Sequence, residues 1–568
     1  MVCLSITVSS GQEPFITPFE DSDGQETATY FECIDFYESL AKRFNTIRMR
    51  EIGPTDSGYP LHVVTFTQNH DPGNSGNEAI RILILNAIHP GEPAGVDASM
   101  MLMRDLASGK IPGEISKDIS LSVIPYYNIG GGLNRSAWSR ANQNGPRDYG
   151  FRGNAKNLDL NRDFIKMDTR NTRSFIEYFH AFDPELFVDT HTTNGADYSY
   201  TMTLVETHPV RLRGYLGEFL KETFTPGLFS TMEMKGHEMV PFVNVYRDTP
   251  DKGFPQFIDY PRYSTGYTAL YQTIGYMSET HMLKSFRERV TATYAFFITL
   301  LENGVLHRDK IKTLREQDRQ GLMQEEHYTL TWTTDMIRPD SIFFKGYRAN
   351  VIQSEITGGE RLLYDREQPL ALNIPYFNKL EIDKTITIPQ AYVIRQAWDK
   401  VIARLDINNV AYTRFMKDTV MDVEMYFIED YQTYQSPYEG HYAHYDTRIR
   451  SIPASIRVQK GDYYVPTRQP AIRYLLEALE PEGDDSFFKW NFFDPILQQK
   501  EHFSPYLFEE TAGKLLQEHP WLKDSLDHKK KMDEAFREDS RAQLEYIYRN
   551  SKYFESTYKQ YPVYRVIE

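Results

Sequence analysis

The sequence has only two cysteines in 568 residues, Cys3 and Cys33, and it contains no Cys-x-x-Cys pair. Zinc sites built from thiolates and dithiol redox motifs are therefore excluded. Basic residues are outnumbered, since 63 Lys and Arg stand against 79 Asp and Glu, which gives a formal net charge of −16, and the first basic residue is Lys42. Such a chain repels phosphate backbones, so we expect no nucleic-acid partner. No apolar run approaches the ~18 residues that a membrane span needs, so we also expect no integral span.

The first ten residues, MVCLSITVSS, are mildly apolar but lack the basic residues with which a signal peptide starts. Two interpretations remain open. The stretch is either the end of a signal peptide that starts upstream or a disordered terminus. Because small residues follow the apolar run, we predict an exported protein, periplasmic or secreted, while a cytoplasmic location stays open. Residues 1–28 are predicted to be a flexible lead.

Predicted strands and helices alternate over residues 29–320, which is typical of an α/β fold. We predict strands at residues 61–66, 81–87, 119–128, 185–193 and 275–280, and helices at residues 29–44, 93–107, 172–182, 212–224 and 283–318. The polar run 68–77 predicts a turn centred on Pro72-Gly73. In α/β folds, ligands bind at the carboxyl ends of the strands, so residues that follow the strands are candidates for a site.

The pattern changes after about residue 320. Short β-like segments separated by Gly, Pro and Asn predict a β-rich accessory region to about residue 480, and residues 500–568 are predicted to be mostly helical. The length of the chain permits more than one domain. We therefore predict a first domain over residues 29–320 and an accessory region over residues 321–568.

The stretch LNAIHPGEPAG places His89 and Glu92 just after a predicted strand, on either side of Pro90-Gly91. Pro-Gly suits a type II turn, which His and Glu could merely flank. The alternative is one half of a metal site, because three protein ligands and an open fourth position form a catalytic zinc site. His237-Glu238 is not followed by a second His, so no His-Glu-x-x-His helix is present. A third ligand must come from another strand.

Two later strand ends supply suitable residues. The run FVDTHTT ends a predicted strand with His191, and the run YMSETH places Glu279 before a helix. Each alone has an ordinary explanation, because His191 could be a hydrogen-bonded core residue and Glu279 a carboxylate at a helix N-terminus. Together with the segment Asp159-Leu160-Asn161-Arg162 between them, their order is hard to explain by chance.

In this order the motifs resemble the carboxypeptidase A-like zinc peptidase family over about residues 28–318. The resemblance implies a mixed central sheet flanked by helices and a zinc peptidase domain over residues 29–320. It also implies one Zn²⁺ per chain, which would polarise the scissile carbonyl and lower the pKa of a water molecule. His89, Glu92 and His191 would hold the metal, and Glu279 would act as the general base that passes the proton to the leaving amine.

The resemblance also implies roles for the Asp-Leu-Asn-Arg segment. Asp159 would accept a hydrogen bond from His89 and so fix its tautomer. Asn161 and Arg162 would bind the terminal carboxylate of the substrate, to which a guanidinium can make a bidentate contact. Asp189 and His281 would support the site rather than bind the metal.

Two further positions of the family pattern have more than one candidate in this chain, and a third departs from it. Arg152 would stabilise the oxyanion, although Arg135, Arg140 and Arg147 occupy the same loop. The digestive members carry an Arg two residues after the first ligand, where this chain has Gly91. The family also places a tyrosine near the substrate, and three candidates fit its position: Tyr260, Tyr263 and Tyr267.

The predicted function is zinc-dependent hydrolysis of a peptide bond next to a C-terminal carboxylate, with a free-ended peptide as the partner. The same site could act on a cell-wall peptide or an N-acyl amino acid. A third interpretation is a non-catalytic binding protein, although neither a ligand nor the base is missing. The oligomeric state and the preferred side chain cannot be inferred from these motifs.

Overall fold

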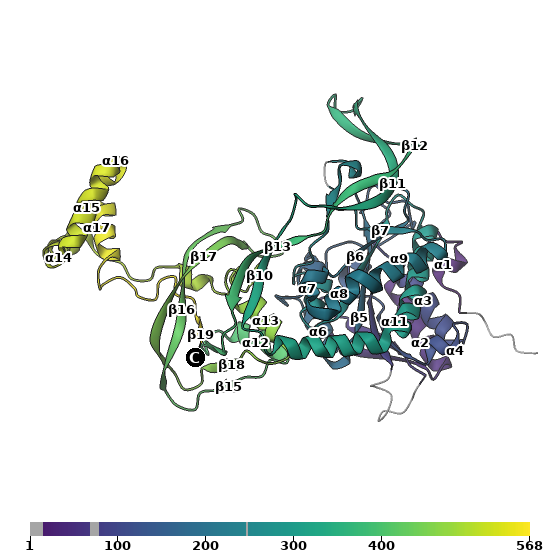
Figure 1. Ribbon diagram of the computed structural model, residues 1–568, viewed down its shortest axis with the longest axis horizontal. Helices are drawn as coiled ribbons and strands as arrows, with labels where there is room; N and C mark the ends of the chain where they lie inside the picture. Colours follow the sequence, from purple (N-terminus) through teal and green to yellow (C-terminus); the bar gives the residue numbers. More distant parts are fainter. Residues whose placement is uncertain (1–14, 69–78, 246–247, 568) are drawn as a thin grey trace, which may run out of the picture.

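The computed structural model describes residues 15–68, 79–245 and 248–567. Its N-terminal part is built on an eight-stranded sheet with the order β1-β2-β4-β3-β5-β9-β6-β7, flanked by helices (Figure 1). The strands are β1 (Ile47–Pro54), β2 (Pro60–Phe66), β3 (Ile80–Leu85), β4 (Ile119–Ile124), β5 (Leu186–Thr193), β6 (Met202–Glu206), β7 (Met239–Pro241) and β9 (Ile274–His281). The central strands β4, β3, β5 and β9 are parallel, and antiparallel pairings join them to β2 and β6. The predicted α/β fold with a mixed central sheet is confirmed.

The two faces of the sheet bury different side chains of the same strands. On one face, Ile82 and Ile84 of β3 pack with α2 (Tyr30–Arg43), α3 (Ala94–Ala107) and α11 (Phe286–Leu322). On the other face, Leu83 and Leu85 pack with α6 (Arg170–Phe182). Because successive side chains of a strand point to opposite faces, a strand that is covered twice must be apolar throughout. This explains why residues 81–87 lack polar alternation.

The remaining helices of this part are short. They are α4 (Gly113–Ser116), α5 (Ile129–Leu133), α7 (Pro209–Leu212), α8 (Gly214–Phe219), α9 (Thr225–Met234) and α10 (Ser264–Ala269). The helix predicted at residues 212–224 corresponds to α8 and the π-helical segment that follows it (Leu220–Phe224), and the helical run continues beyond the predicted end through α9. The turn predicted at Pro72-Gly73 and the first ten residues lie outside the described residues. The strands that flank this turn are not partners, because β4 lies between β2 and β3.

Residues 15–28 differ from the predicted flexible lead. Thr17 caps the short helix α1 (Pro18–Asp21), and the ring of Phe19 packs edge-on against Phe286 at 5.7 Å. Further on, the hydroxyl of Thr27 donates a hydrogen bond of 2.5 Å to the buried carboxylate of Asp97 in α3. These contacts are tertiary, so the local composition of the segment did not reveal them.

Asp97 provides a test of this packing. Burial raises the pKa of Asp97 to about 7, although Thr27 and the backbone of Ala28 donate hydrogen bonds to it. The folded protein therefore keeps a proton that the unfolded chain releases above about pH 4, and stability must fall as the pH rises towards 7. Over that window the loss should reach up to about 4 kcal/mol. Asp97→Asn should remove this part of the pH dependence.

The measurement is urea unfolding of both proteins between pH 5 and 8. As the pH rises, the free energy of unfolding of Asp97→Asn should increase relative to that of the wild type. Asp35→Asn, which makes the same change on the exposed side of α2, should follow the wild type throughout. Parallel pH curves for wild type and Asp97→Asn would contradict the expected raised pKa.

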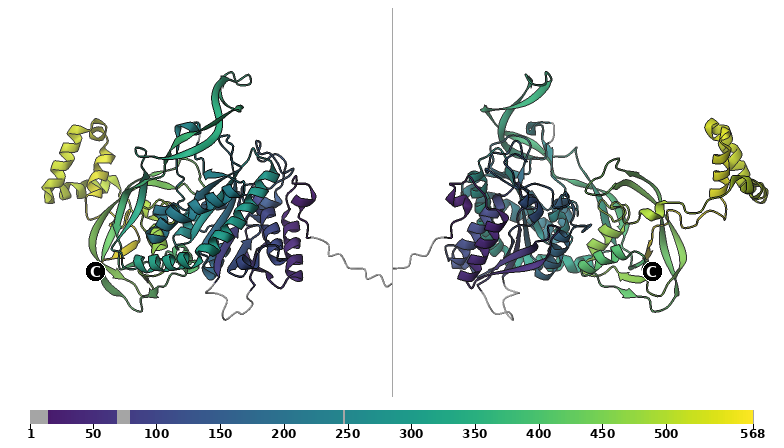
Figure 2. Two further views of the ribbon diagram at one scale, coloured as in Figure 1. Left: turned by 45° about the vertical axis from the view of Figure 1, so that its right-hand side comes forward. Right: turned by 180° about the vertical axis from the view of Figure 1, so that it is seen from behind.

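The C-terminal region is β-rich, as predicted. A long hairpin of β11 (Asp340–Gln353) and β12 (Glu360–Phe377) projects from the protein, and its base pairs with β8 (Phe254–Pro255) (Figures 1 and 2). β10 (His327–Thr334) pairs with β13 (Leu380–Thr387). A six-stranded antiparallel sheet contains β14 (Ala391–Ile394), β15 (Thr413–Arg414), β16 (Thr419–Thr433), β17 (His444–Val458), β18 (Tyr463–Pro466) and β19 (Val563–Val566). Two further helices are α12 (Asp399–Ile407) and α13 (Ile472–Leu479).

The helical tail is a separate unit. Helices α14 (Pro505–Glu518), α15 (Pro520–Met532), α16 (Glu534–Glu538) and α17 (Ser540–Arg549) enclose a small hydrophobic core of their own. They stand apart from the rest of the protein in all views (Figures 1 and 2). The chain then returns, and β19 pairs with both β14 and β16. This strand was not predicted, because its four residues carry too little pattern.

The C-terminal region packs directly against the first domain. The core on the α6 face of the central sheet continues across residue 320 and includes Leu475, Trp490 and Val563. This shared core means that the C-terminal region contributes to one wall of the first domain. No helix in the described part of the chain combines the length and apolar character that a bilayer crossing requires.

Candidate functional site

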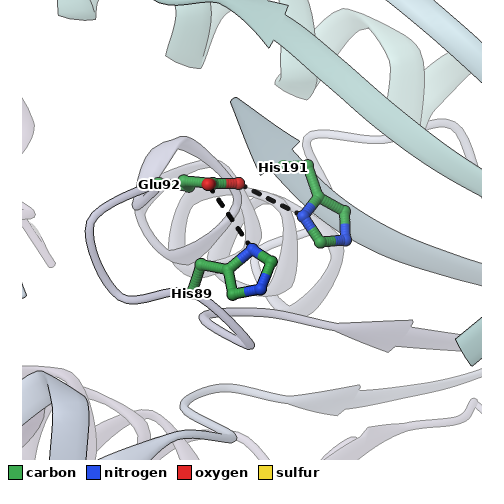
Figure 3. Close-up of side chains that lie close together, drawn as sticks. All are labelled: His89, Glu92 and His191. Carbon is green, nitrogen blue, oxygen red and sulfur yellow. Dashed lines mark hydrogen bonds and ion pairs between the residues drawn. The ribbon is translucent and has the colours of Figure 1, made fainter. Parts of the chain in front are cut away.

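Three potential metal ligands meet at the carboxyl edge of the central sheet. One donor atom each from His89, Glu92 and His191 can be chosen so that all lie within 4.8 Å of one another (Figure 3). Nδ1 of His89 lies 3.4 Å from Oε1 of Glu92, and Nδ1 of His191 lies 3.2 Å from Oε2. β3 leads into the turn that carries the first two residues, and the adjacent parallel strand β5 carries the third. The sequence prediction that these residues converge is therefore confirmed.

Both imidazoles have the same arrangement of partners. Their Nδ1 atoms face Glu92, while each Nε2 atom faces an aspartate: Asp159 at 2.9 Å from His89, and Asp189 at 3.0 Å from His191. Such carboxylates fix the orientation of a metal-binding imidazole and increase its basicity. The contact predicted between His89 and Asp159 is thus present, and Asp189 supports His191 in the same way.

The local fold places Asp159 accurately. Its carboxylate accepts the backbone N–H of Asn161 at 2.9 Å and so caps the 3₁₀ turn Leu160–Arg162. Burial alone would raise the pKa of Asp159, but His89, Arg152 and Arg162 hold it well below its usual range. The group is therefore ionised and accepts a hydrogen bond from Nε2–H of His89.

Arg140 is a site residue that the sequence did not single out. Its Nη1 donates to Oε1 of Glu92 at 2.5 Å, and its Nη2 donates to the backbone oxygen of Thr192 at 2.8 Å. Although burial pushes the pKa of Glu92 upward, Arg140 and His89 hold it well below the ordinary value. The backbone N–H of Thr192 also donates to Oε2 of Glu92 at 2.8 Å. Glu92 is thereby fixed as an anion within the donor cluster.

The turn between His89 and Glu92 differs from the predicted type II. The backbone N–H of Glu92 does bond to the oxygen of His89, at 2.9 Å. Gly91, however, is not among the residues with positive φ, which a type II turn would require there. Glycine is needed here for close packing, because a Cβ would lie 2.8 Å from Cδ of Arg140. The Arg140 side chain thus packs directly against Gly91.

A cavity of about 550 Å³ opens over the donor cluster, and Glu279 lines it. Glu279 lies in β9 directly beside His191, its register partner in β5. Burial raises the pKa of Glu279 to about 7, His191 opposes this shift, and Glu92 adds to it. A carboxylate with a pKa near neutrality can both accept and return a proton. The apolar part of the wall is formed by Val205, Phe242, Phe257, Met277 and Met282.

Asn161 and Arg162 lie in the same cavity. Oδ1 of Asn161 accepts the backbone N–H of Ser264 at 3.0 Å, which fixes the orientation of the amide. The Arg162 guanidinium stacks over the Tyr263 ring at 4.5 Å, and its Nη1 donates to the Asn161 backbone oxygen at 2.8 Å. Its Nε donates to the hydroxyl of Tyr438, a residue of the C-terminal region that sequence analysis missed.

Arg152 also lines the cavity, with its side chain 46% exposed. Its Nε and Nη2 donate to Oδ2 of Asp159 at 3.0 and 2.8 Å, and its Nη1 lies 3.4 Å from Oε1 of Glu92. Of the other arginines in this loop, Arg147 pairs with Glu26, remote from the donor cluster. The assignment of Arg152 to an oxyanion therefore stays a prediction, with Arg140 as its neighbour at Glu92.

The structure distinguishes the three candidate tyrosines. Tyr263 lines the cavity. The Tyr267 hydroxyl instead donates to Asn408 at 2.6 Å, deep in the core, and the Tyr260 ring lies under Arg211 and Arg262. Tyr263 is accordingly the tyrosine placed to meet a substrate. His281 bonds to Asp197 at 3.2 Å and is not part of the donor cluster.

Comparisons with known proteins agree with this geometry. Residues 33–198 match the family model described as zinc carboxypeptidase. Carboxypeptidase 2 of Trichophyton rubrum is 22% identical over 485 residues, which cover 82% of this chain and 84% of that protein. Carboxypeptidase 2 of Trichophyton equinum is 21% identical over 426 residues, covering 72% and 73%. A metallo-carboxypeptidase structure from Burkholderia cenocepacia shares 14% identity with a TM-score of 0.36, covering 47% of this chain and 67% of that one.

The matched segment contains His89, Glu92, Asp159, Asn161, Arg162 and His191. The family match and the donor cluster coincide, and the segment 33–198 of this chain belongs to the zinc carboxypeptidase family.

Proposed function

We propose that the protein is a zinc metallocarboxypeptidase that hydrolyses the peptide bond next to a free C-terminal carboxylate. One observation carries the proposal. The donor cluster, the carboxylate of Glu279 and the Asn161-Arg162 pair all line a single cavity. A metal centre, a proton acceptor and a carboxylate-binding group are thereby available to the same bound peptide.

The residues present fit a zinc ion. Nδ1 of His89 is buried without a hydrogen-bond partner among the described residues, although it faces the other two donors. Two imidazoles and one carboxylate suit Zn²⁺ and leave a fourth coordination position open. His89, Glu92 and His191 would hold the ion. Once bound, zinc would supply Lewis acidity, which polarises a carbonyl and acidifies water.

The chain's own groups account for the proton transfers and the orientation of the substrate. Glu279 accepts a proton from the attacking water and returns it to the leaving amine. Asp159 and Asp189 keep the two imidazoles in one tautomer with Nδ1 facing the centre. Arg152 is placed to support negative charge that develops on the carbonyl oxygen. Arg162 and Asn161 orient the terminal carboxylate, so that the last peptide bond lies beside Glu279.

The test uses two peptides that differ only in a free or an amidated C-terminus. Arg162→Ala should lower kcat/KM for the free peptide by about 10- to 200-fold, since a hydrogen-bonded charge pair contributes roughly 1.5–3 kcal/mol. The amidated peptide lacks the negative charge, so kcat/KM for this peptide should change little. Arg170→Ala, an exposed arginine at the start of α6, is the matched control.

The contrary outcomes are distinct. If Arg162→Ala lowers kcat/KM equally for both peptides, Arg162 does not recognise a terminal carboxylate. An endopeptidase, or an amidase acting on an N-acyl group, is then favoured. If the wild type itself cleaves neither peptide while it holds zinc, a binding role is favoured.

A further inference from the structure

A tight turn of the C-terminal region reaches the carboxylate-binding part of the site. It lies between β16 and β17 and comprises residues 438–441. Tyr438 and His441 exchange two backbone hydrogen bonds, of 2.7 and 3.0 Å, while Glu439 and Gly440 have φ values of 49° and 81°. Positive φ at both central residues is typical of a type I′ turn, which joins strands tightly. Glu439 thus keeps a backbone conformation that glycine or asparagine would adopt more easily.

Three of the four turn residues contact the segment that carries the site. The hydroxyl of Tyr438 accepts Nε–H of Arg162 at 2.9 Å, and Oε2 of Glu439 accepts the backbone N–H of Asp159 at 2.7 Å. Nε2 of His441 bonds to the carboxylate of Asp168 at 2.7 Å. The turn therefore contacts both ends of segment 159–168, and Arg162, the proposed carboxylate-binding residue, lies between these two contacts.

The turn is itself held firmly. The ring of Tyr438 stacks on the Trp490 ring with centroids 6.0 Å apart and planes inclined by 19°. Trp490 is fully buried, and Nζ of Lys166 lies 5.5 Å from its ring centroid. The phenol therefore approaches Arg162 from a rigid support rather than from a freely moving loop.

These contacts determine which edge of Arg162 faces a substrate. Tyr438 occupies Nε, the Asn161 backbone oxygen occupies Nη1, and the Tyr263 ring covers one face of the guanidinium. A carboxylate can approach a guanidinium along either of two edges, and both use Nη2. The single N–H of Nε is already engaged, so the remaining approach is along the terminal edge, through Nη2 and the second N–H of Nη1. The phenol thus limits both the position and the orientation of the arginine.

We propose that Tyr438 is a positioning residue for recognition of the terminal carboxylate, acting through Arg162. On this view the C-terminal region completes the substrate site of the first domain. The inference rests on the proposed function, because it takes Arg162 as the group that binds the carboxylate.

The test is Tyr438→Phe, which removes one hydroxyl and keeps the ring on Trp490. With the free-ended peptide, KM should rise by about three- to tenfold, the size expected for the loss of one ordinary hydrogen bond, because the hydroxyl acts only through Arg162. The turnover number should stay within about twofold, and kcat/KM for the amidated peptide should not change. Tyr442→Phe makes the same change at an exposed residue of the same segment and should behave as the wild type.

A double-mutant cycle separates positioning from general support of the fold. In the Arg162→Ala background, Tyr438→Phe should have no further effect on the free-ended peptide. Zinc content and thermal midpoint should match the wild type in Tyr438→Phe, because a purely structural role would lower the midpoint and affect both peptides.

Each result decides something definite. An unchanged KM in Tyr438→Phe, with a wild type that prefers the free-ended peptide, would overturn the inference and leave the proposed function intact. The inference would also be overturned if Tyr438→Phe lowered kcat/KM equally for both peptides. The same holds if its effect on the free-ended peptide were as large in the Arg162→Ala background as in the wild type. A wild type that cleaves free and amidated peptides equally well would overturn the proposed function and, with it, the inference.

Discussion

Replacing Glu279 with Gln should lower the turnover number by about 10²- to 10⁴-fold, the usual contribution of a general acid–base group. The substitution preserves the size of the side chain and removes only its ability to take a proton. Glu279 lies in β9 beside His191 and lines the cavity, but it is outside the donor cluster. The variant should therefore still bind one zinc ion and show a similar KM.

Steady-state kinetics and metal analysis of the same sample check this prediction. Glu233→Gln, which makes the same change at an exposed position near the end of α9, should keep full activity. Near-normal turnover in Glu279→Gln would remove this residue as the base. A parallel loss of zinc and turnover would show instead that Glu279 helps to hold the metal.

Removing the metal should lower the activity of the wild type at least as much as the Glu279→Gln substitution does. Dialysis against a chelator should lower activity roughly a thousandfold or more, because Lewis-acid stabilisation contributes several kcal/mol. Adding one equivalent of Zn²⁺ should restore it. The three donor residues are only 2–4% exposed, so the ion should leave slowly and long dialysis is needed.

Variants identify the donors. His89→Ala should lose both zinc and activity, whereas His528→Ala, an exposed residue of α15, should lose neither. Asp159→Asn should weaken zinc binding about 10- to 100-fold, as expected for a carboxylate that orients a metal-binding imidazole. Full activity in a preparation shown to contain no metal would refute the mechanism.

The donor residues could be predicted because they lie at or just after the carboxyl ends of strands β3 and β5. β3, β5 and β9 are adjacent and parallel, so their carboxyl ends meet at one edge of the sheet. Residues that are distant in sequence, such as His89 and Glu279, are thereby brought together by the fold class alone. Asp159 and Arg162 followed from the family motif and not from any local pattern.

Other parts of the site could not be predicted, because tertiary contacts select among equivalent residues. Arg140 is one of several arginines in its loop, and its packing against Gly91 and its hydrogen bonds to Glu92 and Thr192 arise only from the tertiary fold. Tyr438 is one of 39 tyrosines and lies in a region without catalytic motifs. The choice of Tyr263 over Tyr260 and Tyr267 likewise depends on which ring faces the cavity.

In the fold, long apolar segments were predicted well and short or exposed ones were not. The central strands and α11 carry strong patterns. β19 has only four residues, and its burial depends on partners in β14 and β16. Residues 15–28 are acidic and resemble a flexible lead, yet Thr27 finds a buried partner in α3. Local composition does not encode such a partner.

The contact between Arg162 and Tyr438 has a consequence for the order of events during biosynthesis. The two residues are 276 positions apart, which a ribosome covers in about 15–55 s at roughly 5–20 residues per second. Glu279 precedes Tyr438 by 159 positions, so for roughly the last 8–32 s of that interval the nascent chain contains every donor residue and Glu279, but not the turn that fixes Arg162. A partly synthesised chain could thus acquire a metal centre well before it acquires tight binding of peptide ends. Full affinity for peptide ends would then arise only after Tyr438 has been added to the chain.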